Sequence, residues 1–155
     1  MPFSRPLAGA LAGFVATAPM TVAMQAMHRF LPWRERYPLP PGQITRKATA
    51  SVGLRKYMGK EERVAATVAS HFAYGAMAGA LYAPLAQRTR LHPTLGGIIY
   101  GLIVWAASYV GLMPALGVLS PVAEHPARRT ILMIVAHLVW GSVTGLLFER
   151  FRRAR

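Results

Sequence analysis

Charged residues divide the chain into four long apolar stretches. Positions 6–28, 64–87, 91–123 and 130–148 contain no Asp, Glu, Lys or Arg. A helix needs about 20 apolar residues to cross roughly 30 Å of hydrocarbon, and each stretch is about that long or longer. The helices of a small soluble bundle would instead carry a charged face, and these stretches have none. The pattern predicts four membrane-spanning helices, at about 7–30, 64–85, 94–116 and 128–148.

Two of these stretches contain the same motif at an offset of 66 positions. The segments 71–82 and 137–148 share the pattern His-x-x-aromatic-Gly-x-x-x-Gly-x-Leu-aromatic without a gap. An internal repeat in a membrane protein indicates equivalent helices that present the same groups at the same depth. We therefore expect the second and fourth helices to superpose, which would place His71 on His137.

Each expected span also contains one Gly-x-x-x-Gly pair, a spacing that lets two helix backbones approach closely. The pairs are Gly9 and Gly13, Gly75 and Gly79, Gly97 and Gly101, and Gly141 and Gly145. Gly9 and Gly97 are 88 positions apart, so the first hairpin holds an insertion of 22 residues (88 minus 66) between its helices. The prediction is an all-α integral membrane four-helix bundle, a single domain over residues 1–155, made of two helical hairpins of like orientation.

The insertion, residues 31–62, lacks membrane-spanning character. It begins with Trp33 and Tyr37, residue types that are enriched at membrane interfaces, within a proline-rich stretch. Residues 43–59 are basic and weakly amphipathic, which predicts either a short helix on the membrane surface or a solvated basic loop. Four basic residues would then face lipid headgroups: Arg46, Lys47, Arg55 and Lys56.

The charge balance favours anionic lipid over nucleic acid as a partner. The chain has 18 Lys and Arg against five Glu and no Asp, for a net charge of +13. In a soluble protein this would suggest nucleic acid, but here the charges flank apolar stretches, where each contributes about 1 kcal/mol toward an acidic leaflet. Eleven basic residues lie on the insertion side and seven on the other, which leaves the membrane orientation open. The charged cluster 124–129 is interpreted as an interfacial anchor at the start of the fourth helix.

The first stretch could also be a signal peptide, since Arg5 precedes it and residues 16–18 read Ala-Thr-Ala. Pro19 would directly follow the cleavage point, and the apolar run continues to Met27. We therefore expect a retained helix with a kink at Pro19, where a backbone donor is missing. There is no cysteine and hence no disulfide.

His71 and His137 are the side chains deep within the expected spans that exchange protons near neutral pH. An ionisable group inside the membrane is a functional candidate because its burial is costly. A neutral imidazole that is hydrogen-bonded within the bundle is the simpler interpretation. Its partner would be a helix carbonyl, a hydroxyl or water, and the candidate side chains are Ser70, Tyr74, Ser108, Tyr109 and Thr144.

Two functional interpretations of the histidine pair stay open. Two imidazoles at matched depth in a bundle would suit bis-histidine ligation of haem b, although close glycine packing competes with a porphyrin for space. A proton relay is the other interpretation, and the absence of carboxylates from the spans opposes it.

A stripe of Met20, Met24 and Met27 followed by His28 could bind Cu(I), but methionine at this spacing in an apolar helix is typical of packing. The sequence has no glycine-rich phosphate loop, no His-x-x-x-His pair and no Ser/His/Asp set. We therefore expect neither a metal site nor an enzyme.

Three segments together resemble the YagU-like group of small bacterial inner-membrane proteins: residues 9–20, residues 37–41 and the two His-aromatic-Gly motifs. The resemblance covers most of the chain and implies a multi-pass inner-membrane protein linked to acid tolerance, with no established enzymatic activity. The expected function is that of a non-enzymatic membrane protein, which supports the envelope under acid stress or serves as an accessory subunit. Its glycine faces would then also serve a homo-oligomer or a membrane complex partner. The alternative is a haem- or proton-handling protein built on His71 and His137.

Overall fold

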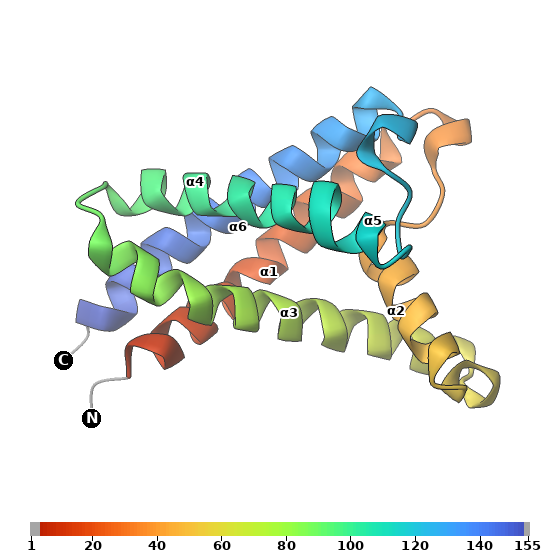
Figure 1. Ribbon diagram of the computed structural model, residues 1–155, viewed down its shortest axis with the longest axis horizontal. Coiled ribbons are helices and arrows are strands. Elements are labelled where there is room, and N and C mark those ends of the chain that lie inside the picture. Colours follow the sequence, from red (N-terminus) through yellow and green to blue (C-terminus); the bar gives the residue numbers. More distant parts are fainter. Residues whose placement is uncertain (1–3, 154–155) are drawn as a thin grey trace.

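The computed structural model describes residues 4–153, which form a bundle of helices (Figure 1). Four helical segments are long and apolar enough to cross a membrane. They are α1 (Arg5–Arg29), α3 (Lys60–Arg88), α4 (Pro93–Ala106) with its continuation to Ala115, and α6 (Ala127–Arg153). The all-α class and the four candidate spans are thus confirmed, and α3 and α6 extend several residues beyond the predicted bounds into charged sequence.

The long helices pack in pairs. α1 packs on α3 and α4 packs on α6, α1 also packs on α6, and α3 and α4 contact each other only weakly. In Figure 1 the start of α1, the end of α6 and the α3–α4 link lie together at one end of the bundle, and the insertion lies at the other. α1 and α4 therefore run in one direction, and α3 and α6 run in the opposite direction.

The Gly-x-x-x-Gly pairs lie where the paired helices contact each other. A β-carbon built on Gly9 or Gly13 would lie well inside 3.0 Å of a carbonyl oxygen of α3. A β-carbon on Gly97 or Gly141 would meet the carbonyl of the other glycine in the same way. Real β-carbons essentially never come that close, so only glycine allows these backbones to approach.

The two helix pairs differ in register by one helical turn. The carbonyl nearest to Gly9 belongs to Gly79. In the repeat, Gly97 corresponds to Gly9 and Gly145 corresponds to Gly79, so Gly97 would be expected to face Gly145. The carbonyl nearest to a β-carbon on Gly97 belongs instead to Gly141. The repeated motif therefore does not produce an identical helix contact, and the superposition of α3 on α6 stays a prediction.

The insertion begins with the short helix η1 (Trp33–Glu35) and then contains two further short helices in place of the single helix expected over 43–59. α2 (Pro40–Ser51) is followed by η2 (Leu54–Tyr57), and Gly53 between them has a φ of 71°. This left-handed conformation favours glycine and ends α2. α2 packs against α3, and its place at a membrane surface stays a prediction.

A buried arginine attaches the insertion to the bundle. Arg129, in the first turn of α6, is 6% exposed. It donates hydrogen bonds to the carbonyls of Glu35, Tyr37 and Pro38 at 2.7, 2.8 and 3.1 Å. Its guanidinium also lies 3.5 Å from the ring centroid of Tyr37. The expectation that the cluster 124–129 is only an interfacial anchor is wrong for Arg129, which fixes the chain just ahead of α2.

Candidate functional site

A cavity of about 200 Å³ lies among the long helices at the end nearest the insertion. Its walls come from α1, α3, α6 and the segment that follows α4, and the first residues of α2 border it. The lining is mainly apolar, and both His71 and His137 belong to it. The other polar lining residues are Thr17, Ser70, Tyr74, Ser108, Tyr109 and Trp140.

His137 is the more deeply buried of the two histidines, with 6% of its surface exposed. Its Nδ1 lies 2.8 Å from the carbonyl oxygen of Met133, one turn earlier on α6. Because a carbonyl can only accept, this nitrogen carries the proton. The ring of Tyr109 packs edge-on against the imidazole, with centroids 6.3 Å apart. The neutral ring therefore offers its other nitrogen, Nε2, as an acceptor.

His71 is partly buried, and its Nδ1 lies 3.3 Å from the hydroxyl of Thr21 on α1. The Thr21 hydroxyl lies 2.7 Å from the carbonyl of Thr17 and donates its single proton there. Nδ1 of His71 is therefore the donor in this contact, and its Nε2 is the acceptor. Both histidines are thus assigned the same tautomer.

The kinds of partner expected for the histidines, a helix carbonyl or a hydroxyl, are confirmed, but the hydroxyl residues named as candidates are wrong. His137 bonds to the Met133 carbonyl, and His71 bonds to the hydroxyl of Thr21, which was not among the named residues. Ser70 bonds instead to the hydroxyl of Thr45 on α2, at 2.7 Å. The spacing within one helix gives no signal for Thr21, because it reaches His71 only through the packing of α1 on α3.

A π-helical segment builds one wall of the cavity. η3 (Ala107–Leu112) follows α4, and the amide of Met113 donates to the carbonyl of Ser108, five residues earlier. The neighbouring residues Ser108 and Tyr109 are both buried and both line the cavity. Pro114 supplies a reason, because its ring would clash with a carbonyl one α-helical turn earlier and a wider turn relieves the clash. The predicted span at about 94–116 is confirmed in its bounds, and the π-helical turn within it was not predicted, although Pro114 is a local signal for it.

A hydrogen bond between two hydroxyl groups lies on the side of the cavity between α3 and η3. The hydroxyls of Tyr74 on α3 and Ser108 on η3 lie 2.6 Å apart. α3 and α4 diverge from their link toward the insertion (Figure 1), and they contact each other weakly. Tyr74 is 40% exposed, so this bond lies at the boundary between the cavity and the outside of the bundle.

The hydroxyl of Tyr109 is buried without a hydrogen-bond partner among residues 4–153. The side chain is only 7% exposed and lines the cavity. Leaving a buried donor unsatisfied costs about 1–3 kcal/mol. A polar atom of a bound molecule, or an ordered water, would remove this cost.

The other candidate residues are spread over several places in the structure. Met20 and Met24 belong to the hydrophobic core, and Met20 also lines the cavity. His28 Nε2 lies 3.2 Å from the carbonyl of Tyr37. Within the part of the chain that the structure describes, no group of three or more His, Asp or Glu side chains could hold a metal ion. Of the four basic residues expected to face headgroups, Lys47 donates to the carbonyl of Gly117, and contact of all four with headgroups stays a prediction.

The fold and the site together indicate a multi-pass membrane protein with a small cavity between its helices. Residues 16–146 match the model of a family described as "Protein of unknown function (DUF1440)", and the chain belongs to this family. No curated protein and no solved structure matches the chain. The matched segment includes every residue that lines the cavity.

Proposed function

We propose that the protein is a non-enzymatic integral membrane protein that binds a small, largely apolar molecule in the cavity. The observation that carries this proposal is an apolar cavity with a buried, unpartnered Tyr109 hydroxyl and two imidazoles that offer Nε2 as acceptors. Ligand pockets are typically apolar clefts with a few placed polar groups.

The size and the polar groups of the cavity narrow the class of ligand. At about 200 Å³ it is smaller than the roughly 300–1,000 Å³ of pockets for drug-sized ligands. A hydroxyl group would complement its polar atoms, since it can donate to an imidazole Nε2 and accept from Tyr109. The ligand class that fits is a short-chain alcohol or a small phenol, which would enter from the bilayer between α3 and η3.

The cellular setting that we propose is the bacterial inner membrane, in keeping with the resemblance to the YagU-like group. There the protein would support the envelope under acid stress or act as an accessory subunit, with the insertion facing anionic headgroups. A β-carbon on any of the eight glycines of the Gly-x-x-x-Gly pairs would contact atoms of the same chain, so these glycines already lie in contacts within the bundle. A homo-oligomer or a membrane complex partner would therefore bind at another face.

Labelling with a photoreactive octanol tests the proposed cavity ligand. We expect the label on residues of η3 and α6 that line the cavity, and we expect excess octanol to compete with it. Val104 lines the cavity, so Val104→Trp should fill it and reduce labelling about tenfold, which corresponds to a loss of about 1.4 kcal/mol in binding. The products are mapped by peptide mass spectrometry on the detergent-purified full chain.

Val110→Trp is the matched control for this experiment. Val110 lies on the same continuous helix, is 58% exposed and does not line the cavity, so the same substitution there should leave cavity labelling unchanged. Equal loss in both variants, or labelling spread over outward-facing residues without competition, would contradict the proposal.

Haem or proton handling by His71 and His137 is the second candidate function. It is favoured by the tautomer of both rings, because a histidine that ligates a metal usually donates its other ring nitrogen to a fixed acceptor. The small cavity and the close glycine contacts oppose a porphyrin.

We therefore expect the purified protein to be colourless, and its absorption spectrum measures this. A Soret band that disappears in His71→Ala and His137→Ala would replace the leading proposal with haem binding. In a colourless protein, loss of acid survival in His71→Gln and His137→Gln cells with normal amounts of folded protein would favour proton handling.

A further inference from the structure

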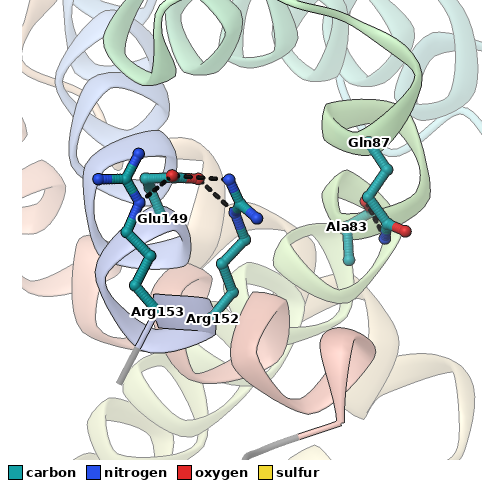
Figure 2. Close-up of polar contacts among 5 residues, drawn as sticks. All are labelled: Ala83, Gln87, Glu149, Arg152 and Arg153. Atoms are coloured by element: carbon teal, nitrogen blue, oxygen red, sulfur yellow. Dashed lines mark hydrogen bonds and ion pairs between the residues drawn. The ribbon is translucent and has the colours of Figure 1, made fainter. Parts of the chain in front are cut away.

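A second hollow, of about 510 Å³, lies at the end of the bundle opposite the insertion. It is bordered by the end of α3, the link to α4, the first turn of α4 and the end of α6. Figure 2 shows one side of this region, where Glu149, Arg152 and Arg153 project from α6 and Gln87 lies across the gap on α3. We call it the arginine hollow, after the residues that line it: Arg5, Arg90, Arg152 and Arg153.

The arginine hollow carries a large excess of positive charge. Four arginines line it against one carboxylate, that of Glu149. That carboxylate is shared between two of them, since it accepts from Arg152 Nη2 at 2.7 Å and also from Arg153. Arg90 forms no ion pair among residues 4–153 and is exposed. Guanidinium groups are well suited to bind the oxygens of phosphate and carboxylate groups.

The hydroxyl of a largely buried tyrosine side chain borders the same hollow. Tyr82 is 4% exposed and lines the hollow, yet its hydroxyl makes no hydrogen bond to any residue from 4 to 153. Its ring is fixed between Tyr100 and Phe148, with centroids 5.1 and 5.5 Å away. A β-carbon on Gly96 would lie 3.2 Å from the hydroxyl, so the hydroxyl reaches the first turn of α4. This positioned donor indicates a ligand more specifically than surface charge does.

The start of α4 adds the positive end of a helix to the site. Pro93 and Gly96, in the first turn of this 14-residue helix, both line the hollow. Pro93 has no amide hydrogen, and the Gly96 amide donates to the carbonyl of His92 at 2.9 Å, so neither residue offers a free backbone donor. The helix dipole still makes this end of α4 positive. A helix N-terminus of this kind is a common site for phosphate oxygens.

We propose that the arginine hollow binds a phosphate group, with the Tyr82 hydroxyl and the arginine guanidiniums as donors and the positive end of α4 beside them. The phosphate belongs either to the headgroup of an acidic phospholipid or to a small soluble phosphate, since both present the same oxygens. The hollow lies at the end of the candidate spans, where a lipid phosphate would lie in a bilayer. This inference is independent of the proposed function of the central cavity.

Native mass spectrometry of the detergent-purified full chain, titrated with phosphatidylglycerol or phosphatidylcholine, tests the inference. We expect phosphatidylglycerol to bind more tightly than phosphatidylcholine and to saturate a single site. Tyr82→Phe keeps the ring and the net charge but removes the donor, and should weaken this binding about tenfold, the usual size of a hydrogen bond to a charged group. Arg90→Gln, on the exposed link, should weaken it to a similar extent.

Arg150→Gln is the control for charge, because Arg150 is exposed near the end of α6 and does not line the hollow. We expect it to leave the affinity within about twofold of the wild type. Displacement of the lipid by millimolar inorganic phosphate would identify a site for a soluble phosphate, and resistance to displacement would identify a lipid site. The inference is overturned if phosphatidylcholine binds equally well, or if Tyr82→Phe has no effect while Arg90→Gln and Arg150→Gln weaken binding equally.

Discussion

Alanine in place of Gly141 is expected to destabilise the bundle by about 3 kcal/mol, the upper part of the usual range for overpacking. The added β-carbon would lie well inside 3.0 Å of the carbonyl of Gly97 and close to the α-carbon of Gly101. These are backbone atoms, which cannot rotate away as a side chain can. α4 and α6 must therefore separate along their main contact. A denaturant titration of the detergent-purified protein, followed by circular dichroism, measures the change.

Gly111→Ala is the matched control for this prediction. Gly111 lies in the segment that continues α4, and a β-carbon there would meet nothing within 4 Å. We expect no loss of stability, because alanine favours a helix over glycine and meets no neighbour. Equal stability of Gly141→Ala and Gly111→Ala would mean that the helix backbones do not approach as closely as the structure shows.

The positions of the spans could be read from the sequence because a bilayer imposes a simple requirement. Any uncharged stretch of about 20 residues can satisfy its backbone as a helix in hydrocarbon, and the four stretches became the four long helices. The glycine pairs were likewise recognisable, since close approach of backbones needs small residues.

The register of the glycine contacts could not be predicted in the same way. A spacing of four residues defines a stripe on one helix, but it does not define which turn of the partner lies opposite. Gly97 could have faced Gly145 or Gly141, because both belong to the same stripe of α6. That choice depends on the packing of whole helices, to which α1 also contributes through its contact with α6.

Only some of the residues that line the cavity could be predicted from the sequence. The repeat singled out His71 and His137, which both line it. The contact of the Thr21 hydroxyl with His71 depends on the packing of α1 on α3, whereas the π-turn that brings in Tyr109 has only a local signal, Pro114. Arg129 was missed for a related reason: its partners are backbone carbonyls, which every residue carries and no motif marks.

Replacing Arg129 with glutamine is expected to release the insertion from the bundle. The substitution removes hydrogen bonds to the carbonyls of Glu35, Tyr37 and Pro38, together with the cation–π contact to the Tyr37 ring. Hydrogen bonds to a charged group contribute about 1.5–3 kcal/mol each, so even partial compensation by glutamine leaves a loss of about 3 kcal/mol in docking. Trypsin should then cleave after Arg34 or Arg36 at least about tenfold faster, because cleavage follows the population of the open segment.

Arg128→Gln isolates this effect, because it removes the same charge one residue away. The Arg128 side chain is 68% exposed, and its one ion pair, with Glu35 at 3.7 Å, is long. Exposed ion pairs contribute about 0–1 kcal/mol, so its cleavage rate should stay close to that of the wild type. Limited proteolysis with mapping of the cut sites compares the two variants directly. If both variants are cleaved equally fast, the interfacial charge of this cluster holds the insertion and the buried contacts of Arg129 do not. If neither is cleaved faster, the insertion is held by the packing of α2 on α3 alone.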